Sequence, residues 1–509
     1  MERFKNIMNM LKEHSMAAAM AGCIATAGLT VIMLAAPLPL AWDFVLLLFA
    51  AVLNYKDFLN CASALAAKTI DENFLPLLAV VISAAALEPG YAGAVLTAEA
   101  FAGLICKVII PKRYEEGQRN LAEGGSLNIY GGFRPSGKTA IYFACAGCMV
   151  FLVWMIATSV GGSVQWKEGL LHSGAFMAAV CGLDFMCGKK LALKKARRQM
   201  EDAGIHLHKK SDDDLSEETI ENIGKTDVIF IEQKNIVTLT ENIVTDITAF
   251  YDITEEELLY LFETGEKSRK GPVGKRTEFT ENGKNYMTGK PTQIKGAPRN
   301  DRHWQQALGQ ADIMRRMGRI PVLICDSDRI LGMLSVEEKL NPTAAEGITM
   351  MGAMGIEAVM FSENDRLTAD STGRKAGVRK VYAGASRANK RTLIAEAEAA
   401  GKKTAFMGET LKAVMGMGAE VTIAIGPGGA ADAEAEDNNL LRIEKMFKGG
   451  RKFIDKLRKG RKLSVAYDAA AMLLLTGLLY PICGFEADPL TGSAAFVCFI
   501  LVRLVLSFW

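Results

Sequence analysis

The sequence predicts a bundle of membrane-spanning helices joined to a large soluble α/β region. Half of the 509 residues are hydrophobic, which is more than a soluble enzyme needs and less than a protein made only of membrane helices contains. The long apolar stretches gather toward both ends of the chain. Between them, short apolar runs alternate with amphipathic segments, a pattern typical of strands and helices in turn.

Eight apolar stretches have about the length that crosses a bilayer. They are 16–36, 41–60, 74–88, 90–110, 139–161, 169–188, 463–483 and 489–509. The turns on one side of these stretches hold one basic residue, Lys167, whereas the other side holds the basic clusters 107–113, 189–198 and 448–462. The positive-inside bias therefore predicts a multi-pass protein of the cytoplasmic membrane, with both termini and the soluble region in the cytoplasm.

Two motifs near the membrane are expected to have no chemical role. The string GFRPSGKT at 132–139 matches a phosphate-binding loop, but a membrane span begins at its threonine and no strand precedes it. Cys145 and Cys148 form a CxxC inside an apolar span, where packing of small residues is the better interpretation. The ten cysteines show no spacing that predicts a disulfide framework or a zinc site.

The stretch 226–242, TDVIFIEQKNIVTLTEN, carries the main functional signal. Its first half predicts a buried strand, and a polar turn follows. The TLT after that turn resembles the phosphorylation site of the P-type ATPases, DKTGTLT, in which the aspartate attacks the γ-phosphate of ATP. Counting back from TLT places Lys234 at the aspartate position. Because an ammonium cannot form an acyl phosphate, the resemblance implies the scaffold of a pump without its nucleophile.

Further motifs of that family appear downstream in order. RLTA at 366–369 matches the residues that follow the family's TGDN motif. This alignment places Asn364 at the aspartate position of TGDN. Lys390, in SRANKRTLI, matches the lysine that neutralises the transferring phosphoryl group. The magnesium motif GDGxNDxP aligns with 408–415, where Glu409 and Ala413 replace its two aspartates. The resemblance therefore implies that Mg²⁺ binding is lost together with the nucleophile.

The same resemblance implies a nucleotide-binding region. Lys295 and Gly296, in KGAP, match the family's KGA signature, and Phe279 stands where that family stacks a phenylalanine on adenine. We expect these residues to bind ATP without hydrolysing it.

The resemblance also implies a domain order: a cytoplasmic α/β domain similar to the haloacid dehalogenases, carrying a small inserted α+β domain similar to the nucleotide-binding domain. The expected segments are membrane helices in 1–110, a loop at the actuator position in 111–138, membrane helices in 139–190, the phosphorylation-like domain in 191–245 and 316–447, the insert in 246–315, and a basic linker with the last membrane helices in 448–509. The loop is far too short for an actuator domain.

Carboxylates inside apolar stretches are candidates for an ion site, because burying them is costly. Asp468 is the first candidate, since it resembles an aspartate in the fifth core span of the potassium-importing P-type subunit. Asp184 and Glu99 are the others, and for both a bland structural role is an open alternative.

Three functions follow from these observations. The first is a catalytically inactive relative of the P-type pumps, with a regulatory, nucleotide-sensing or partner-binding role. The second is a divergent active cation pump that uses another carboxylate, such as Glu232. The third is a passive ion pathway or scaffold. The expected partners are the lipid bilayer and a membrane protein, and no feature predicts nucleic-acid binding.

Overall fold

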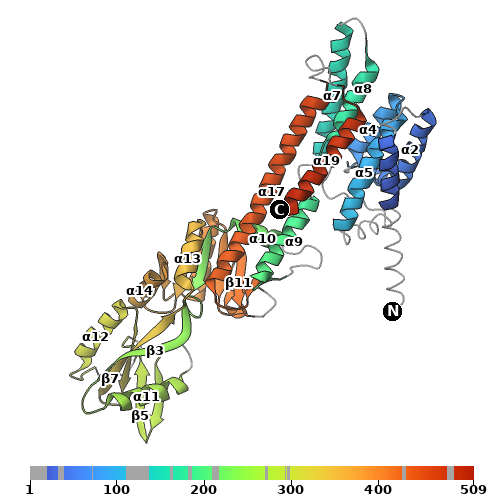
Figure 1. Ribbon diagram of the computed structural model, residues 1–509. Helices are drawn as coiled ribbons and strands as arrows, with labels where there is room; N and C mark the ends of the chain where they lie inside the picture. The colour runs from blue at the N-terminus through green and yellow to red at the C-terminus, as the bar shows by residue number, and fades with distance from the viewer. Residues whose placement is uncertain are drawn as a thin grey trace, which may run out of the picture. The chain divides into compact units, whose positions relative to one another are not determined.

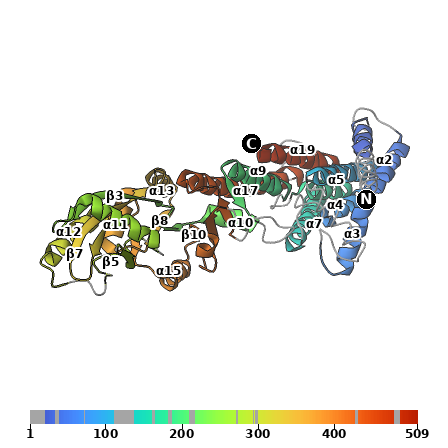
Figure 2. The ribbon, with the colours of Figure 1, turned by 90° about the horizontal axis from the view of Figure 1, so that it is seen from below.

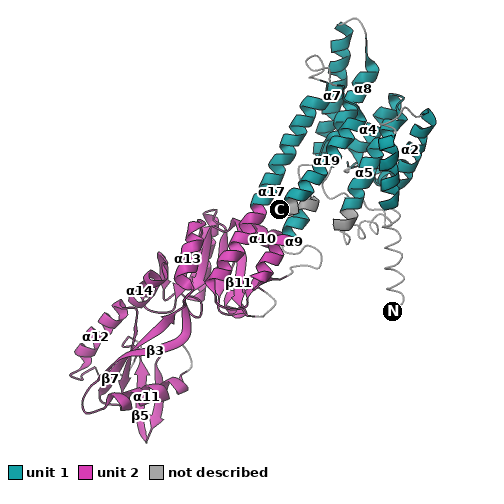
Figure 3. Ribbon diagram, viewed as in Figure 1, with its two compact units in different colours: residues 1–194, 455–509 teal, residues 195–454 magenta. Residues whose placement is uncertain are grey.

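The described part of the chain divides into two compact units. The computed structural model describes residues 20–32, 39–70, 73–109, 137–160, 164–181, 186–208, 217–269, 273–292, 294, 299–426, 431–477 and 486–508. Unit 1 consists of residues 1–194 and 455–509, and unit 2 of residues 195–454, as Figure 3 shows in two colours. Most of the predicted loop 111–138 lies outside the described residues.

Unit 1 is helical in its described residues (Figure 1). Its helices are Met20–Ile32, α2 (Leu40–Leu53), α3 (Tyr55–Ala66), α4 (Phe74–Ala85), α5 (Pro89–Ile109), α7 (Gly137–Val160), α8 (Trp166–Ala179), the first part of α9 (Met186–Asp202), the second part of α17 (Leu440–Leu475) and α19 (Pro489–Phe508). Each of the eight predicted stretches contains at least part of a helix.

Two of these helices are long and apolar enough to cross a membrane by themselves, Gly137–Val160 and Pro489–Leu506. Leu40–Leu53 and Asp57–Ala66 pass the same test only as one span bent by 66°. Met20–Ile32 and Phe74–Ala85 are apolar but shorter. A membrane-spanning helical part is therefore confirmed for the described residues, and the number of eight spans stays a prediction.

Helix α8 lies at the centre of unit 1 and packs against α4, α7 and α19. Small residues allow the close approach: a Cβ atom on Gly492 would lie 2.1 Å from the Ala175 carbonyl oxygen, and one on Gly174 would lie 3.1 Å from Pro489 Cγ. Such small-residue contacts are typical of helices that pack within a membrane. The helix ends at Ala179, and Val180 is extended with ψ of 133°.

Unit 2 contains a seven-stranded sheet in the order β1-β12-β11-β10-β2-β8-β9. The strands are β1 (Ile205–Leu207), β2 (Val228–Glu232), β8 (Glu357–Ser362), β9 (Lys380–Ala383), β10 (Thr404–Gly408), β11 (Val421–Ile425) and β12 (Ala433–Ala435). All neighbours are parallel except β1 and β12. The predicted parallel sheet is thus present, and apolar β2 lies in its interior because both of its faces are covered.

The helices of this part of unit 2 follow the predicted alternation with the strands. They are α10 (Glu217–Lys225), α13 (Ala344–Ala353), α14 (Arg366–Ala376), α15 (Arg387–Ala399), α16 (Leu411–Val414) and the first part of α17. Ile394 of α15 packs in one core with Phe230, Phe361 and Phe406 of the sheet. The residues that alternate with these phenylalanines along each strand point to the opposite face of the sheet, where helices must cover them.

A five-stranded antiparallel sheet forms the second part of unit 2. Its order is β3-β7-β6-β5-β4. The strands are β3 (Thr238–Ala249), β4 (Thr277–Glu281), β5 (Lys284–Gly289), β6 (Ile320–Cys325) and β7 (Ile330–Leu340). Helix α11 (Glu255–Ser268) packs on one face through Leu258 and Phe262, and α12 (Trp304–Arg316) packs on the other through Ala307 and Ala311. Figure 2 shows this sheet at one end of unit 2, away from β8 and β10.

The inserted domain is larger than the predicted 246–315. Strands β6 and β7, which the sequence analysis assigns to the parallel sheet, pair with each other and with β3 and β5 in the antiparallel sheet. The insert therefore runs from Thr238 to Leu340. The physical reason is that a continuous apolar run such as IPVLIC fits either kind of buried strand, so its pattern cannot identify its neighbours.

Candidate functional site

The candidate site lies where three parallel strands end. Glu232 is the last residue of β2 and pairs with Phe361 of β8, while Ile231 pairs with Met407 of β10. Ligands of open α/β sheets bind at the carboxyl ends of the strands. The side chain of Glu232 therefore stands at the position in this sheet where chemistry is expected.

Glu232 forms an ion pair with Lys390 of α15. The distance from Lys390 Nζ to Glu232 Oε1 is 2.7 Å, and the two side chains are 10% and 19% exposed, respectively. The ammonium also lies 5.9 Å from the centre of the Phe361 ring. A pair this well shielded from water is held much more firmly than one at the surface.

The pair forms part of the wall of a cleft of about 320 Å³. The lining residues are Glu232, Glu363, Gly384, Ala385, Ser386, Arg387, Lys390, Ala413 and Met417. Arg387 and Lys390 belong to the first turn of α15, and Ser386 caps this helix by accepting a hydrogen bond from the Asn389 N–H. The helix N-terminus and the two cations favour an anion, and the two carboxylates oppose one.

Lys234 lies in the turn after β2 and faces a different partner. Its side chain is 62% exposed, and its Nζ lies 3.8 Å from Glu409 Oε2. The turn is closed by the N–H groups of Val237 and Thr238, which donate to the Gln233 carbonyl oxygen, and Asn235 adopts φ of 55°. The structure therefore brings Glu232, rather than Lys234, to the retained lysine.

The positions expected for a divalent cation hold few oxygen atoms. Glu409 is paired with Lys234, and Ala413 contributes only a methyl group to the cleft. A Cβ atom on Gly408, the last residue of β10, would lie 3.3 Å from Glu232 Oε2. Among the described residues, no three His, Cys, Asp or Glu side chains gather into a metal-binding group.

Comparison with known proteins agrees with this fold. No protein-family model matches the chain. A silver exporting P-type ATPase of Salmonella typhimurium is 20% identical over 72% of this chain and 46% of the relative. A copper-transporting P-type ATPase of Rhizobium leguminosarum bv. viciae is 21% identical over 70% of this chain and 45% of the relative. The chain thus spans about half the length of these curated relatives.

A solved structure resembles the chain over almost its whole length. The crystal structure of a zinc-transporting PIB-type ATPase in the E2.Pi state superposes with a TM-score of 0.61, at 13% identity, over 96% of this chain and 99% of that chain. The chain is similar in sequence to curated P-type ATPases and shares its fold with a solved one. It is a multi-pass membrane protein with an α/β part.

The residues expected to bind nucleotide are described only in part. Phe279 lies on β4, stacks on Tyr286 with ring centres 5.6 Å apart, and packs against Gly265 of α11. Lys295 and Gly296 lie outside the described residues. Phe279 thus belongs to the apolar layer between α11 and the sheet, with part of its surface exposed.

Lys290 is a buried cation that the sequence analysis missed. It follows β5, is 7% exposed, and donates a hydrogen bond from Nζ to Asn364 Oδ1 at 3.0 Å. Removal from water lowers the pKa of Lys290, and the carboxylates of Asp365 and Glu338 act in the opposite direction. No sequence motif marks this lysine, because its burial arises only when the two sheets of unit 2 meet.

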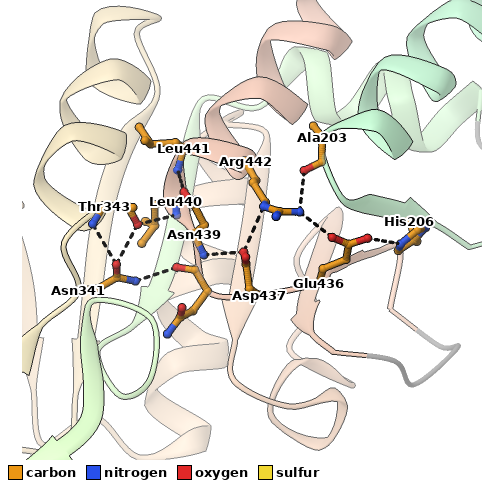
Figure 4. A network of polar contacts seen from close by, with 11 residues as sticks. Ala203, His206, Asn341, Thr343, Glu436, Asp437, Asn439, Leu440, Leu441 and Arg442 are labelled. Carbon is orange, nitrogen blue, oxygen red and sulfur yellow. Dashed lines mark hydrogen bonds and ion pairs between the residues drawn. The ribbon is translucent and has the colours of Figure 1, made fainter.

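A network of asparagine contacts ties the turn after β2 to the start of α17, and Figure 4 shows the part of it near α17, with Asn341 and Asn439 labelled. Asn341 Nδ2 donates to the carbonyl oxygens of Ile236 at 2.8 Å and Asn438 at 2.7 Å. Asn438 Nδ2 donates in turn to the Asn235 carbonyl oxygen at 3.0 Å. The position of the turn therefore depends on residues about 100 and 200 positions later in the chain.

The described membrane candidates have separate surroundings. Asp468 of α17 is buried, and its Oδ1 accepts a hydrogen bond from the Cys181 N–H at 2.9 Å, just after α8 ends. Tyr467 donates to the Ala179 carbonyl oxygen at 2.9 Å. Glu99 is buried in α5, and Asp184 lies outside the described residues. Tyr467 thus satisfies a carbonyl oxygen that the end of α8 leaves without a helical donor, and Asp468 binds an N–H just beyond that end.

Proposed function

We propose that this chain is an inactive relative of the P-type pumps that lies in the cytoplasmic membrane and binds a phosphate-bearing ligand without becoming phosphorylated. The observation that carries the proposal is the ion pair between Glu232 and Lys390. In a working site the carboxylate must attack phosphorus while cations neutralise the phosphoryl oxygens. Here the lysine suited to that task is already bound to the carboxylate.

The arrangement around the pair supports the same proposal. Glutamate is one methylene longer than aspartate, so its carboxylate reaches farther from β2 and into contact with Lys390. Glu409 is bound to Lys234, and Gly408 has no side chain. A divalent cation in this place would have to displace an ammonium group. The α/β part then acts by binding a ligand. The expected ligand is ATP, and the expected function of this binding is to regulate a membrane partner.

A divergent active pump is the second candidate. A carboxylate stands at the end of the central strand beside the retained lysine, which is the arrangement that an acyl-phosphate acceptor needs. In this reaction a Glu232 oxygen would bond to the γ-phosphorus of ATP, the bond to the bridging oxygen would break, and ADP would leave. The curated relatives named above transport silver or copper ions, so a transition-metal ion is the substrate class to test first.

One experiment separates the two candidates. Purified full-length protein is incubated with Mg²⁺ and ATP radiolabelled at the γ-phosphate, quenched in acid and separated on an acidic gel. We expect no labelled band from the wild type or from Glu232→Asp. A hydroxylamine-sensitive band that disappears in Glu232→Gln would contradict inactivity and establish the second candidate. A copper-transporting relative prepared in the same way is the positive control.

Nucleotide binding is tested separately from phosphorylation. We expect calorimetric titration with a non-hydrolysable ATP analogue to give a binding isotherm that Phe279→Ala weakens. Tyr260→Ala, an exposed aromatic of α11 in the same part, is the matched control. No heat of binding in the wild type would favour the third interpretation, a passive ion pathway or scaffold.

The arrangement in the membrane is part of the proposal. We infer eight spans with the termini and unit 2 in the cytoplasm, because the basic clusters 107–113, 189–198 and 448–462 all fall on that side. Accessibility labelling of single cysteines placed in the turn 161–168 and in α15 tests it. Labelling of both positions from the same side of the membrane would contradict it.

A further inference from the structure

The two sheets of unit 2 are joined by a buried lysine. Lys290 leaves the five-stranded sheet at the end of β5, and its ammonium reaches Asn364, which follows β8 of the seven-stranded sheet. The stem of the side chain is held in place: a Cβ atom on Gly274 would lie 2.7 Å from Lys290 Cγ, and the Lys290 N–H donates to the Gly274 carbonyl oxygen at 2.7 Å.

The acceptor, Asn364, lies next to two residues of the cleft wall. The Asn364 N–H donates to Ser362 Oγ at 3.0 Å, and its carbonyl oxygen accepts the Gly384 N–H at 3.2 Å. Glu363 and Gly384 both line the cleft that holds Glu232. A displacement of the Asn364 side chain therefore reaches the cleft through two residues. These are Glu363, which precedes Asn364 in the chain, and Gly384, which donates its N–H to the Asn364 carbonyl oxygen.

The free-energy cost and gain of the contact between Lys290 and Asn364 oppose each other. Burying the ammonium is costly, and a hydrogen bond to a neutral amide offsets less of this cost than one to a carboxylate would. When the sheets part, Lys290 regains water and Asn364 loses its donor. One other link across the boundary is weaker in kind: Lys375 of α14 pairs with Glu337 of β7 at 2.6 Å, but both side chains are substantially exposed.

We propose that Lys290 and Asn364 form a latch that holds the five-stranded sheet against the wall of the cleft, and that release of this latch lets the two sheets separate. The latch is independent of whether Glu232 accepts phosphate. Asparagine at position 364 keeps the latch releasable, because an aspartate there would convert it into a buried ion pair.

Hydrogen exchange measured by mass spectrometry on the full-length protein tests the latch. The reporting amides are Lys290, Asn364 and Gly384, whose N–H groups are bonded within the latch or beside it. We expect Lys290→Ala to speed exchange in peptides containing these amides by about tenfold or more, the size of one charged hydrogen bond. Exchange in β10 and β11 should stay unchanged.

Two further variants keep the test decisive. Lys375→Ala, which removes the exposed pair across the same boundary, should change the reporting amides by less than about threefold. Asn364→Asp should slow them below wild type. If Lys290→Ala matches Lys375→Ala, or speeds β10 and β11 equally, the latch is refuted. If Lys290→Ala does not fold, Asn364→Asp decides: unchanged or faster exchange at Lys290 and Gly384 overturns the proposal.

Discussion

Glu232 and Lys390 lie 158 residues apart in the sequence, and their side chains meet at 2.7 Å. The carboxylate is at the end of the central strand and the ammonium is on the first turn of a helix. Charge at this point of the sheet is therefore already balanced in the absence of any ligand.

Loss of Lys390 should destabilise the protein more than loss of both partners. Lys390→Met leaves the Glu232 carboxylate shielded and unpaired, at a cost of about 3 kcal/mol. The double variant Glu232→Gln with Lys390→Met should recover most of this loss, because no charge is then left buried. Thermal unfolding of the purified full-length variants measures the difference. Equal loss in the single and double variants would mean that the pair is not coupled.

Asn341→Ala should loosen the turn after β2. Its amide group donates to two backbone oxygens that the substitution leaves buried, so we expect a loss of about 1–3 kcal/mol. Asn285→Ala, on the exposed side of β5, is the matched control and should cost little. Protease resistance of the full-length protein at increasing urea compares the two. A similar loss in both would argue against the asparagine network.

Lys290 should make the stability of the protein rise with pH in the alkaline range. Burial lowers its pKa in the folded state, whereas the unfolded side chain keeps its ordinary value of 10.5. Between these two values the unfolded state binds more protons, so this residue adds stability as pH rises through its folded pKa. The unfolding midpoint of wild type minus that of Lys290→Met should rise from neutral pH to pH 10. A flat or falling difference would contradict the lowered pKa.

Asp468 should support the end of α8. Asp468→Ala removes the acceptor of the Cys181 N–H, and we expect a loss of about 1–3 kcal/mol in the stability of unit 1. Asp468→Asn keeps an oxygen at the same position and should lose much less. Retention of a monodisperse species on heating in detergent ranks the two variants. If asparagine is as damaging as alanine, the charge of Asp468 matters more than its hydrogen bond.

Much of this architecture could be predicted because it depends on local patterns. Apolar length indicated the membrane helices, and alternation of strands with helices indicated the parallel sheet. Two features could not be predicted from such patterns. The assignment of β6 and β7 depends on partners distant in sequence. The neighbours of Glu232 and Lys234 depend on where β2 ends. Counting back from the TLT motif, on the far side of the turn, selected Lys234, whereas the carboxylate that meets Lys390 is Glu232, two residues earlier.

The missing side chain at position 408 constrains how this sequence can change. Any atom added to Gly408 enters the space beside the Glu232 carboxylate and also meets Ala413 and Val414 at 3.0 Å. Ala413 and Val414 would still occupy that space if a shorter acid stood on β2. Position 408 should therefore stay glycine among homologues, whichever acid stands at 232.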